Sequence, residues 1–401
     1  MKKRCIFIII LLIICTALIL IKPKNKYLID EQSVAIFIDG SKTDSFPAKG
    51  TVAFQKADCD NNVNIEWDND TWGLYATNLS NKVKCNIYFK TGENAVTKIT
   101  NLASTDTANI ATDDPDNNIR YIGANPNNYV YFNCSDYANQ TSDTCELWRI
   151  IGVFNNIEKE DGTKENLIKI VRDDAIQWLS YDTSSSDIND GLGINDWSTS
   201  TLMRLLNPGY ELQKVGGSLY WNASGGSCYH GRNNNTMDCY FMDTGMKNNR
   251  TKNSIQSVVW NLGGSTLTDT AKEFYQNERG TNVYENNSTK WTGKIALIYP
   301  SDYWYATGGG STTSRDECLN KSLKDSDDDC SHNNWQGYTQ QKWTLTPYPN
   351  NTENGFCMEY GLLKVCNPYY GRNINPALFL KSNILITSGD GSKNTPYQLG
   401  L

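Results

Sequence analysis

Ten of the twelve cysteines follow residue 26, and they fall into five close pairs along the chain. The pairs are Cys59/Cys85, Cys134/Cys145, Cys228/Cys239, Cys318/Cys330 and Cys357/Cys366. Four of them are separated by 9 to 12 positions, a spacing at which a hairpin or short loop brings two Cα atoms within disulfide range. A cytosolic chain rarely carries this pattern, so it predicts an oxidising, extracytoplasmic setting, although ten cysteines permit many connectivities.

The pair Cys357/Cys366 gives the most specific prediction. If Gly361-Leu362 is a two-residue turn, Cys357 lies opposite Cys366 and Glu359 lies opposite Lys364. The two cysteines then form a non-hydrogen-bonded pair, in which Cα atoms approach to about 4.5 Å. The opposite-charge pair supports this register, and two unrelated buried thiols are the alternative.

The N-terminus predicts export. Residues 1–4 are basic after the initial Met, and the 17 residues 5–21 carry no charge. This run reaches the lower limit for spanning a membrane, and no small-residue cleavage site follows it. We therefore expect residues 1–26 to form an uncleaved signal anchor, a transmembrane helix that holds the rest of the chain outside the cell. A cleaved signal peptide is the alternative.

The charge balance argues against a nucleic-acid partner, because 44 acidic residues outnumber 37 basic ones and no basic block follows the apolar run. The Asp-rich runs at 113–116 and 327–329 suit solvated loops; calcium binding is the alternative, although the twelve-residue spacing of a calcium loop is not found. Only two histidines, His230 and His332, are present, which disfavours a zinc site. We expect no cofactor.

The chain after the anchor is long enough for two domains. Residues 31–103 contain short alternating apolar runs between turn residues, which predicts a small β-sandwich. Residues 104–118 are polar and acidic, which is typical of a linker. Residues 119–401 contain strand-like runs on both sides of three helix signals, at 198–206, 255–262 and 268–280, and this order predicts an α+β domain.

The motifs of the second domain resemble a group of uncharacterised surface proteins from low-GC Gram-positive bacteria. The similarity begins at 116–128 and 147–153 and continues through 202–207. It ends with Trp343-Thr344-Leu345-Thr346-Pro347 and with Asn373-Ile374-Asn375-Pro376-Ala377-Leu378-Phe379-Leu380, which are similar to the W-x-L-R-S-P and G-V-R-P-A-L motifs of a widespread bacterial domain of unknown function. That resemblance implies a C-type-lectin-like fold, the fold of formylglycine-generating enzymes and of diversified receptor-binding proteins.

The chain departs from this pattern where the wider domain has arginines. Leu345-Thr346 and Ile374-Asn375 stand before the two prolines, so no role of those arginines carries over. The formylglycine-generating branch uses two reactive cysteines in its C-terminal part, and Cys357 and Cys366 lie in a similar region. An extracellular enzyme of that type or of a thiol-redox type is therefore an alternative function, although the predicted hairpin favours a structural disulfide.

Eleven tryptophans and 23 tyrosines supply candidates for ligand contacts. Six aromatic residues are predicted to present their faces to sugars or peptides, with core packing as the alternative; these are Tyr303, Trp304, Tyr305, Tyr348, Tyr369 and Tyr370.

The sequence thus predicts an α+β C-type-lectin-like domain at 119–401, preceded by a small all-β sandwich domain and an N-terminal transmembrane helix. The predicted function is a membrane-anchored cell-surface protein that binds a glycan or protein ligand outside the cell. A structural envelope component without a discrete ligand is the further alternative.

Overall fold

The structure of this chain is a computed structural model that describes residues 33–60, 63–69, 71–77, 83–184, 191–322, 328–337 and 341–401. Strands make up 37% of the residues and helices 14%, so the fold is mostly β. The longest described helix, α2 (Ala95–Ala103), has nine residues. The predicted α+β, C-type-lectin-like fold class is therefore wrong.

The N-terminal transmembrane helix that belonged to the same prediction receives no support. The predicted signal anchor at 1–26 lies outside the described residues. Within the described ranges, no helix combines the length and the apolar character that crossing a membrane requires.

The segment 255–262, predicted as a helix, instead forms two consecutive strands. The short helix α4 (Asn249–Ser254) ends just before it, and β16 (Ile255–Gln256) and β17 (Val258–Asn261) follow. Val258, Trp260 and Leu262 are buried while the residues between them are partly exposed. This period of two is the strand pattern, and it competes with the helical spacing of the same apolar residues.

The described residues form two compact units, which divide between Thr91 and Gly92. The first unit holds two sheets, and Phe54, Ile87 and Phe89 are buried between them with Trp67 packed against this cluster. Its strands are β2 (Ser41–Thr43), β1 (Ser33–Ile38), β6 (Lys84–Thr91) and β3 (Val52–Cys59), in sheet order, and the pair β4 (Asn64–Asp68) and β5 (Gly73–Thr77).

The unit boundary lies earlier than the end of the predicted first domain at residue 103. Helix α2 belongs to the second unit, where its Ile99 is fully buried. The predicted linker at 104–118 also belongs there, because β8 (Ile110–Ala111) joins the main sheet and Asp114 is buried against Arg120. A run of polar residues resembles a linker, but Asp114 in this run is paired with Arg120 inside the fold.

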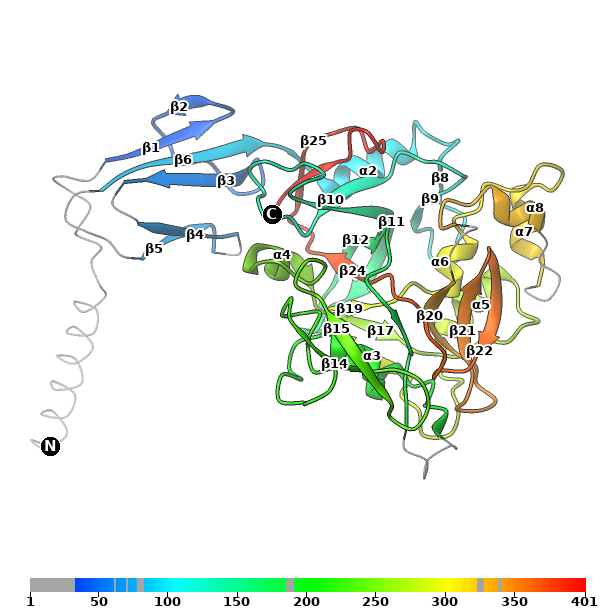
Figure 1. Cartoon of the computed structure of the whole chain (residues 1–401). Coiled ribbons are helices and arrows are strands. Elements are labelled where there is room, and N and C mark those ends of the chain that lie inside the picture. The colour runs from blue at the N-terminus through cyan, green and yellow to red at the C-terminus, as the bar shows by residue number, and fades with distance from the viewer. Residues whose placement is uncertain are drawn as a thin grey trace, which may run out of the picture. The chain divides into compact units, whose positions relative to one another are not determined.

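An eight-stranded sheet forms the centre of the second unit, and Figure 1 shows its strands β12 and β24 inside that unit. Six strands follow one another in the order β16, β24 (Ala377–Leu380), β12 (Lys164–Arg172), β11 (Glu146–Glu158), β9 (Ile119–Tyr121) and β8, while β10 (Tyr129–Phe132) pairs with β11 and β19 (Ile295–Ala296) with β24. Strand β11 has a nearly unbroken buried run, as expected for a strand covered on both faces. At its centre, a Cβ on Gly152 would lie 1.8 Å from the carbonyl oxygen of Ile119, so only glycine fits there.

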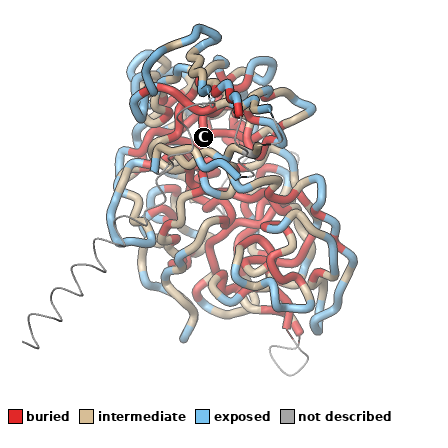
Figure 2. Tube along the Cα trace, turned by 90° about the vertical axis from the view of Figure 1, so that its left-hand side faces the viewer, coloured by how far each residue is buried: buried red, intermediate tan, exposed pale blue. Residues whose placement is uncertain are grey.

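Smaller sheets and short helices surround this centre. The five-stranded sheet has the order β13 (Trp178–Leu179), β23 (Arg372–Asn373), β20 (Lys342–Pro347), β21 (Gly355–Glu359) and β22 (Leu362–Cys366), and the three-stranded sheet β26 (Gln398–Gly400), β25 (Leu385–Ser388) and β7 (Glu93–Asn94). The remaining pairs are β14 (Gly225–Tyr229) with β15 (Thr236–Tyr240) and β17 with β18 (Lys290–Gly293). The remaining helices are η3 (Trp197–Thr199), α3 (Thr201–Leu206), α5 (Ala271–Glu278), α6 (Pro300–Trp304), α7 (Arg315–Asn320) and α8 (Asp328–His332). Figure 2 shows buried residues along the inner strands and exposed residues mainly on outer turns.

All five cysteine pairs predicted from the spacing are disulfides, which confirms that part of the prediction. The predicted register of the last hairpin is not correct. Its turn is Tyr360-Gly361, where both residues have positive φ (49° and 80°) as a type I′ turn requires. Cys357 therefore faces Lys364 rather than Cys366, and the disulfide joins diagonal neighbours whose Cα atoms are 6.0 Å apart.

Two further disulfides link neighbouring elements at the periphery of the second unit. Cys228 on β14 is bonded to Cys239 on β15, with 5.8 Å between their Cα atoms. Cys318 on α7 is bonded to Cys330 on α8, with 5.7 Å between their Cα atoms. The first bridge closes a β-hairpin, and the second joins two helices. A spacing of 11 or 12 positions in the sequence therefore does not show which type of element a disulfide links.

Ionic side chains occupy the interior of the second unit. Asp302 accepts hydrogen bonds from Arg120 at 2.6 Å and from Lys169 at 2.5 Å, and all three side chains are at most 1% exposed. Burial by itself raises the pKa of Asp302, but the attraction of Lys169 and Arg120 lowers this pKa to about 2. Asp302 is therefore a buried carboxylate held by two buried cations.

Glu278, at the end of α5, is fully buried beside this group and accepts hydrogen bonds from Ser301. Burial raises the pKa of Glu278 to about 7, although Arg279 and Ser301 oppose the shift. The folded state favours the protonated form of Glu278. The stability that this preference contributes is complete below pH about 4.5 and is lost as pH rises through about 7.

As pH rises from about 5 to 8.5, the wild type should therefore lose free energy of unfolding that the variant Glu278→Gln keeps. The difference between the two losses should be on the order of 3 kcal/mol, because glutamine has the shape of the protonated glutamate and does not ionise. Urea unfolding at the two pH values measures this difference. The exposed Glu160→Gln is the control and should follow the wild type. A Glu278→Gln profile parallel to the wild type would contradict the raised pKa.

Candidate ligand-binding surface

The structure places the six predicted aromatic residues in three environments. Tyr303, Trp304 and Tyr305 are 2–4% exposed and belong to an apolar core cluster, so they present no face to a ligand. Tyr348 is half-buried against the same cluster. Tyr369 and Tyr370 remain at the surface, where their ring centroids lie 4.2 Å apart.

A further aromatic residue, Trp178 on β13, joins this pair. It is 42% exposed, and Tyr370 is 47% exposed. Strand β13 pairs with β23, so Trp178 lies opposite Asn373 and beside the loop that carries the tyrosines. The guanidinium of Arg372 lies 6.0 Å from the Trp178 ring and 5.8 Å from the Tyr370 ring, which places it between them.

Hydrogen bonds from the end of β13 fix the tyrosine loop. The Tyr181 N–H donates to the carbonyl of Pro368 at 2.8 Å, and the Ser180 hydroxyl donates to the carbonyl of Tyr369 at 2.6 Å. Ser180 also accepts from the Gly231 N–H, which attaches the turn after β14. Because backbone groups make most of these bonds, the position of the rings depends little on ring identity.

Glycine is required next to the tyrosines. A Cβ on Gly371 would lie 2.1 Å from Nε1 of Trp178 and 2.9 Å from Cε1 of His230. The absence of a side chain lets the tryptophan and the histidine approach the loop backbone. We call the surface made by Trp178, Tyr369, Tyr370, Arg232 and Arg372 the aromatic surface.

The two arginines of the aromatic surface differ in their partners. Arg372 donates to Glu359 at 2.5 Å, so its charge is neutralised and its position is fixed. Arg232 lies over the Tyr369 ring at 4.7 Å and donates to the Tyr369 hydroxyl at 3.4 Å. No carboxylate in the described ranges lies within ion-pair distance of Arg232, so its charge is not committed to an ion pair there.

Flat exposed rings with guanidinium donors at their edges are suited to stacking and hydrogen bonding. Aromatic faces carry partial negative charge, which attracts the C–H face of a sugar ring or a cation. Arg232 then supplies donors for hydroxyl or acidic groups of the same ligand. Neither interaction needs a nucleophile or a metal.

The cysteines considered for catalysis have a structural role in this fold. Cys357 and Cys366 are bonded to each other, and they are 0% and 6% exposed. Together with Glu359 they bring three ligand-type atoms within 4.8 Å, but metal binding and nucleophilic attack both need a thiolate. A disulfide at this position supplies none.

The other predicted disulfide cysteines of the second unit are also buried and bonded, and none of them belongs to the aromatic surface. Cys239 is 4% exposed and Cys330 is 2% exposed, and their partners Cys228 and Cys318 are fully buried. A buried disulfide offers neither a nucleophile nor a ligand-facing polar group. These four residues, like Cys134 and Cys145, therefore have a structural role and do not form part of the candidate site.

Sequence reasoning missed Trp178 and Arg232. The signal at Trp178 was weak because its strand has two residues, of which Leu179 is 1% exposed while Trp178 faces the opposite side. Arg232 follows a Gly-rich turn in a polar segment, and nothing in the sequence connects it with Tyr369, which lies 137 positions later.

The comparisons with known proteins return no relative. No protein-family model, no curated protein and no solved structure matches the chain. The resemblance to Gram-positive surface proteins stays an untested prediction, and the functional argument depends on the fold and the aromatic surface alone.

Proposed function

We propose that this protein is an extracellular binding protein whose second unit holds a glycan on the aromatic surface. Five disulfides support the extracellular setting, because such bonds persist in oxidising compartments. The observation that carries the proposal is the exposure of Trp178, on strand β13, beside Tyr370, on a loop fixed by hydrogen bonds to its backbone. Large aromatic rings are usually buried, and exposed clusters mark interaction sites.

A glycan is the preferred ligand because the rings are accompanied by polar groups rather than by other apolar side chains. Arg232, Glu359 and Arg372 border the rings, and this mixture matches a sugar, which has both C–H faces and hydroxyls. A protein interface more commonly has an apolar centre inside a polar rim.

Replacing Trp178 or Tyr370 by alanine should weaken glycan binding by at least about tenfold each, since stacked aromatic residues dominate binding energies. The chain is first applied to an array of immobilised saccharides, and the best ligand is then titrated. Trp178 is 42% exposed and Tyr370 is 47% exposed, so circular dichroism should show an unchanged fold.

Tyr240→Ala is the matched control, because Tyr240 is 60% exposed and lies at the other end of the β14–β15 hairpin. It should bind like the wild type. Glycan binding that survives in both Trp178→Ala and Tyr370→Ala would contradict the proposal. If the chain bound a protein ligand and no saccharide on the array, the proposal of a glycan ligand would also be rejected.

A further inference from the structure

A small cavity lies in the second unit and shares no residue with the aromatic surface. Its volume is about 180 Å³, below the ~300 Å³ at which pockets for drug-sized ligands begin. The side chains that matter for its chemistry are Arg149, Asp173, Trp335, Gln336, Lys342 and Asn375.

Arg149, on β11, is 4% exposed and has one unused nitrogen. Its guanidinium is held over Tyr129 at 3.7 Å and over Trp335 at 4.6 Å. Nε donates to Asn128 at 2.6 Å, and the nearest described carboxylate, on Asp173, is 3.8 Å from the first terminal nitrogen. The second terminal nitrogen has no partner among the described residues. A buried, rigidly stacked guanidinium with a free edge is an anion receptor.

Lys342, at the start of β20, adds a second buried cation. It is 7% exposed and donates to the carbonyl of Gln336 at 2.6 Å. Burial lowers the pKa of Lys342 to about 8, although the attraction of Asp173 opposes this shift. Among the described residues, no carboxylate lies within ion-pair distance of the Lys342 ammonium. Asp173 is the carboxylate that faces both Arg149 and Lys342, and its side chain is 28% exposed.

Two lining residues also carry a buried side-chain oxygen that has no hydrogen-bond partner among the described residues. Gln336 and Asn375 are each 5% exposed, and the side-chain oxygen of each lacks a described hydrogen-bond partner. Their amide orientations are fixed, because the nitrogen of Gln336 donates to the carbonyl of Asp302 and that of Asn375 donates to Arg172 and Asp173 carbonyls. A buried polar atom without a partner costs free energy, which a ligand or a water removes.

The cavity therefore combines an anion receptor with two acceptors and a carboxylate. From this we infer that the cavity binds a small zwitterion, a free α-amino acid. Its carboxylate pairs with Arg149 and Lys342, and its ammonium donates to Asp173, Gln336 and Asn375. Acetate satisfies only the cations and methylammonium only the acceptors, so neither fills the site.

Calorimetric titration of the full chain with glycine, L-alanine, D-alanine and L-serine tests the inference, with acetate and methylammonium as single-charge probes. At least one amino acid should bind at least about tenfold more tightly than either single-charge probe, and should raise the melting temperature with concentration. Failure of all four amino acids to bind up to about 10 mM would overturn the inference and leave water as the occupant.

Two variants separate the roles. Asp173 is partly exposed, so the substitution Asp173→Asn is expected to be tolerated by the fold. It should weaken amino-acid binding by about tenfold and leave the affinity for acetate unchanged or increased. Lys342→Gln should weaken both, and the exposed Lys364→Gln is its control. Equal effects of Asp173→Asn on acetate and on the amino acid would contradict the assigned orientation. These outcomes are independent of the aromatic surface, because no lining residue is shared.

Discussion

Replacing Asp302 with alanine should destabilise the second unit by about 3–5 kcal/mol, the largest single effect expected in this chain. The carboxylate receives Arg120 and Lys169, and it also accepts from the N–H of Tyr299 at the start of α6. Without it, two buried cations lose a shared counter-charge. Arg120 keeps Asp114 at 2.8 Å, whereas the partners that remain for Lys169 among the described residues are the rings around it, with Tyr299 at 4.4 Å.

Urea unfolding of Asp302→Ala and of Asp161→Ala provides the comparison. Asp161 also faces a lysine, Lys159 at 3.8 Å, but it is 62% exposed, so its loss should change the stability little. Adding Lys169→Met to Asp302→Ala should restore part of the stability, because it removes the cation left without a partner. Equal, small losses for the two aspartates would contradict the buried ionic centre.

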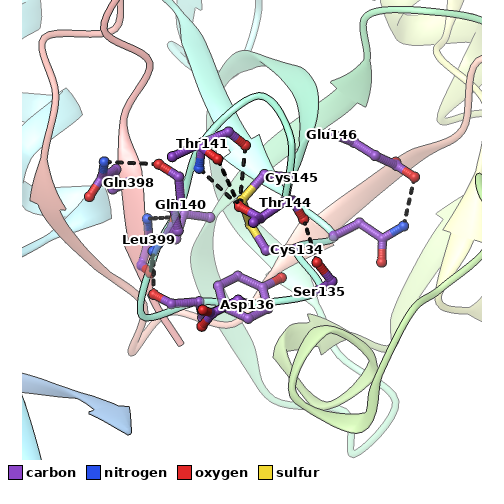
Figure 3. Close-up of a disulfide and its surroundings, with 12 residues drawn as sticks. Cys134, Ser135, Asp136, Gln140, Thr141, Thr144, Cys145, Glu146, Gln398 and Leu399 are labelled. Carbon is purple, nitrogen blue, oxygen red and sulfur yellow. Dashed lines mark hydrogen bonds between the residues drawn. A yellow bond between two sulfur atoms is a disulfide. The ribbon is translucent and has the colours of Figure 1, made fainter.

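Replacing Cys134 and Cys145 together with serine should cost about 2–4 kcal/mol. The disulfide closes the loop between β10 and β11, and Figure 3 shows that this loop lies against the C-terminal strand β26. The Gln140 side chain donates to the carbonyl of Leu399 at 2.7 Å and accepts from the Leu399 N–H at 3.0 Å, as a neighbouring strand would. Opening the loop therefore loosens β26 as well.

Thermal unfolding together with hydrogen exchange at Leu399 measures both effects. Replacing Cys59 and Cys85, which join two strands of the first unit, is the control and should leave exchange at Leu399 unchanged. Retained protection of Leu399 in the Cys134/Cys145 variant would show that the Gln140 contacts hold β26 without the disulfide.

Short-range features of this fold could be predicted from the sequence. The cysteine pairs separated by 9 to 12 positions are close in space because short loops leave few alternatives. Even so, the turn of the last hairpin was placed one residue late. Tyr360 adopts a positive φ, which is uncommon for a bulky residue, whereas the sequence favours a turn that begins at Gly361.

Long-range features could not be predicted. Arg120 and Asp302 are 182 positions apart, and neither has a neighbour that marks it as buried. Tyr303, Trp304 and Tyr305 have the same local composition as a surface cluster, yet they are buried because α6 packs against α5 and β20. Burial of a short aromatic run is decided by its tertiary neighbours, which periodicity over three residues does not reveal.

Non-reducing peptide mapping of the secreted chain, with free thiols blocked before proteolysis, is the most direct test of an extracellular binding protein braced by disulfides. The account predicts five bridges, each between the nearest cysteines, and no free thiol beyond residue 26. Free Cys357 and Cys366 would contradict it, and would favour thiol chemistry over a binding role.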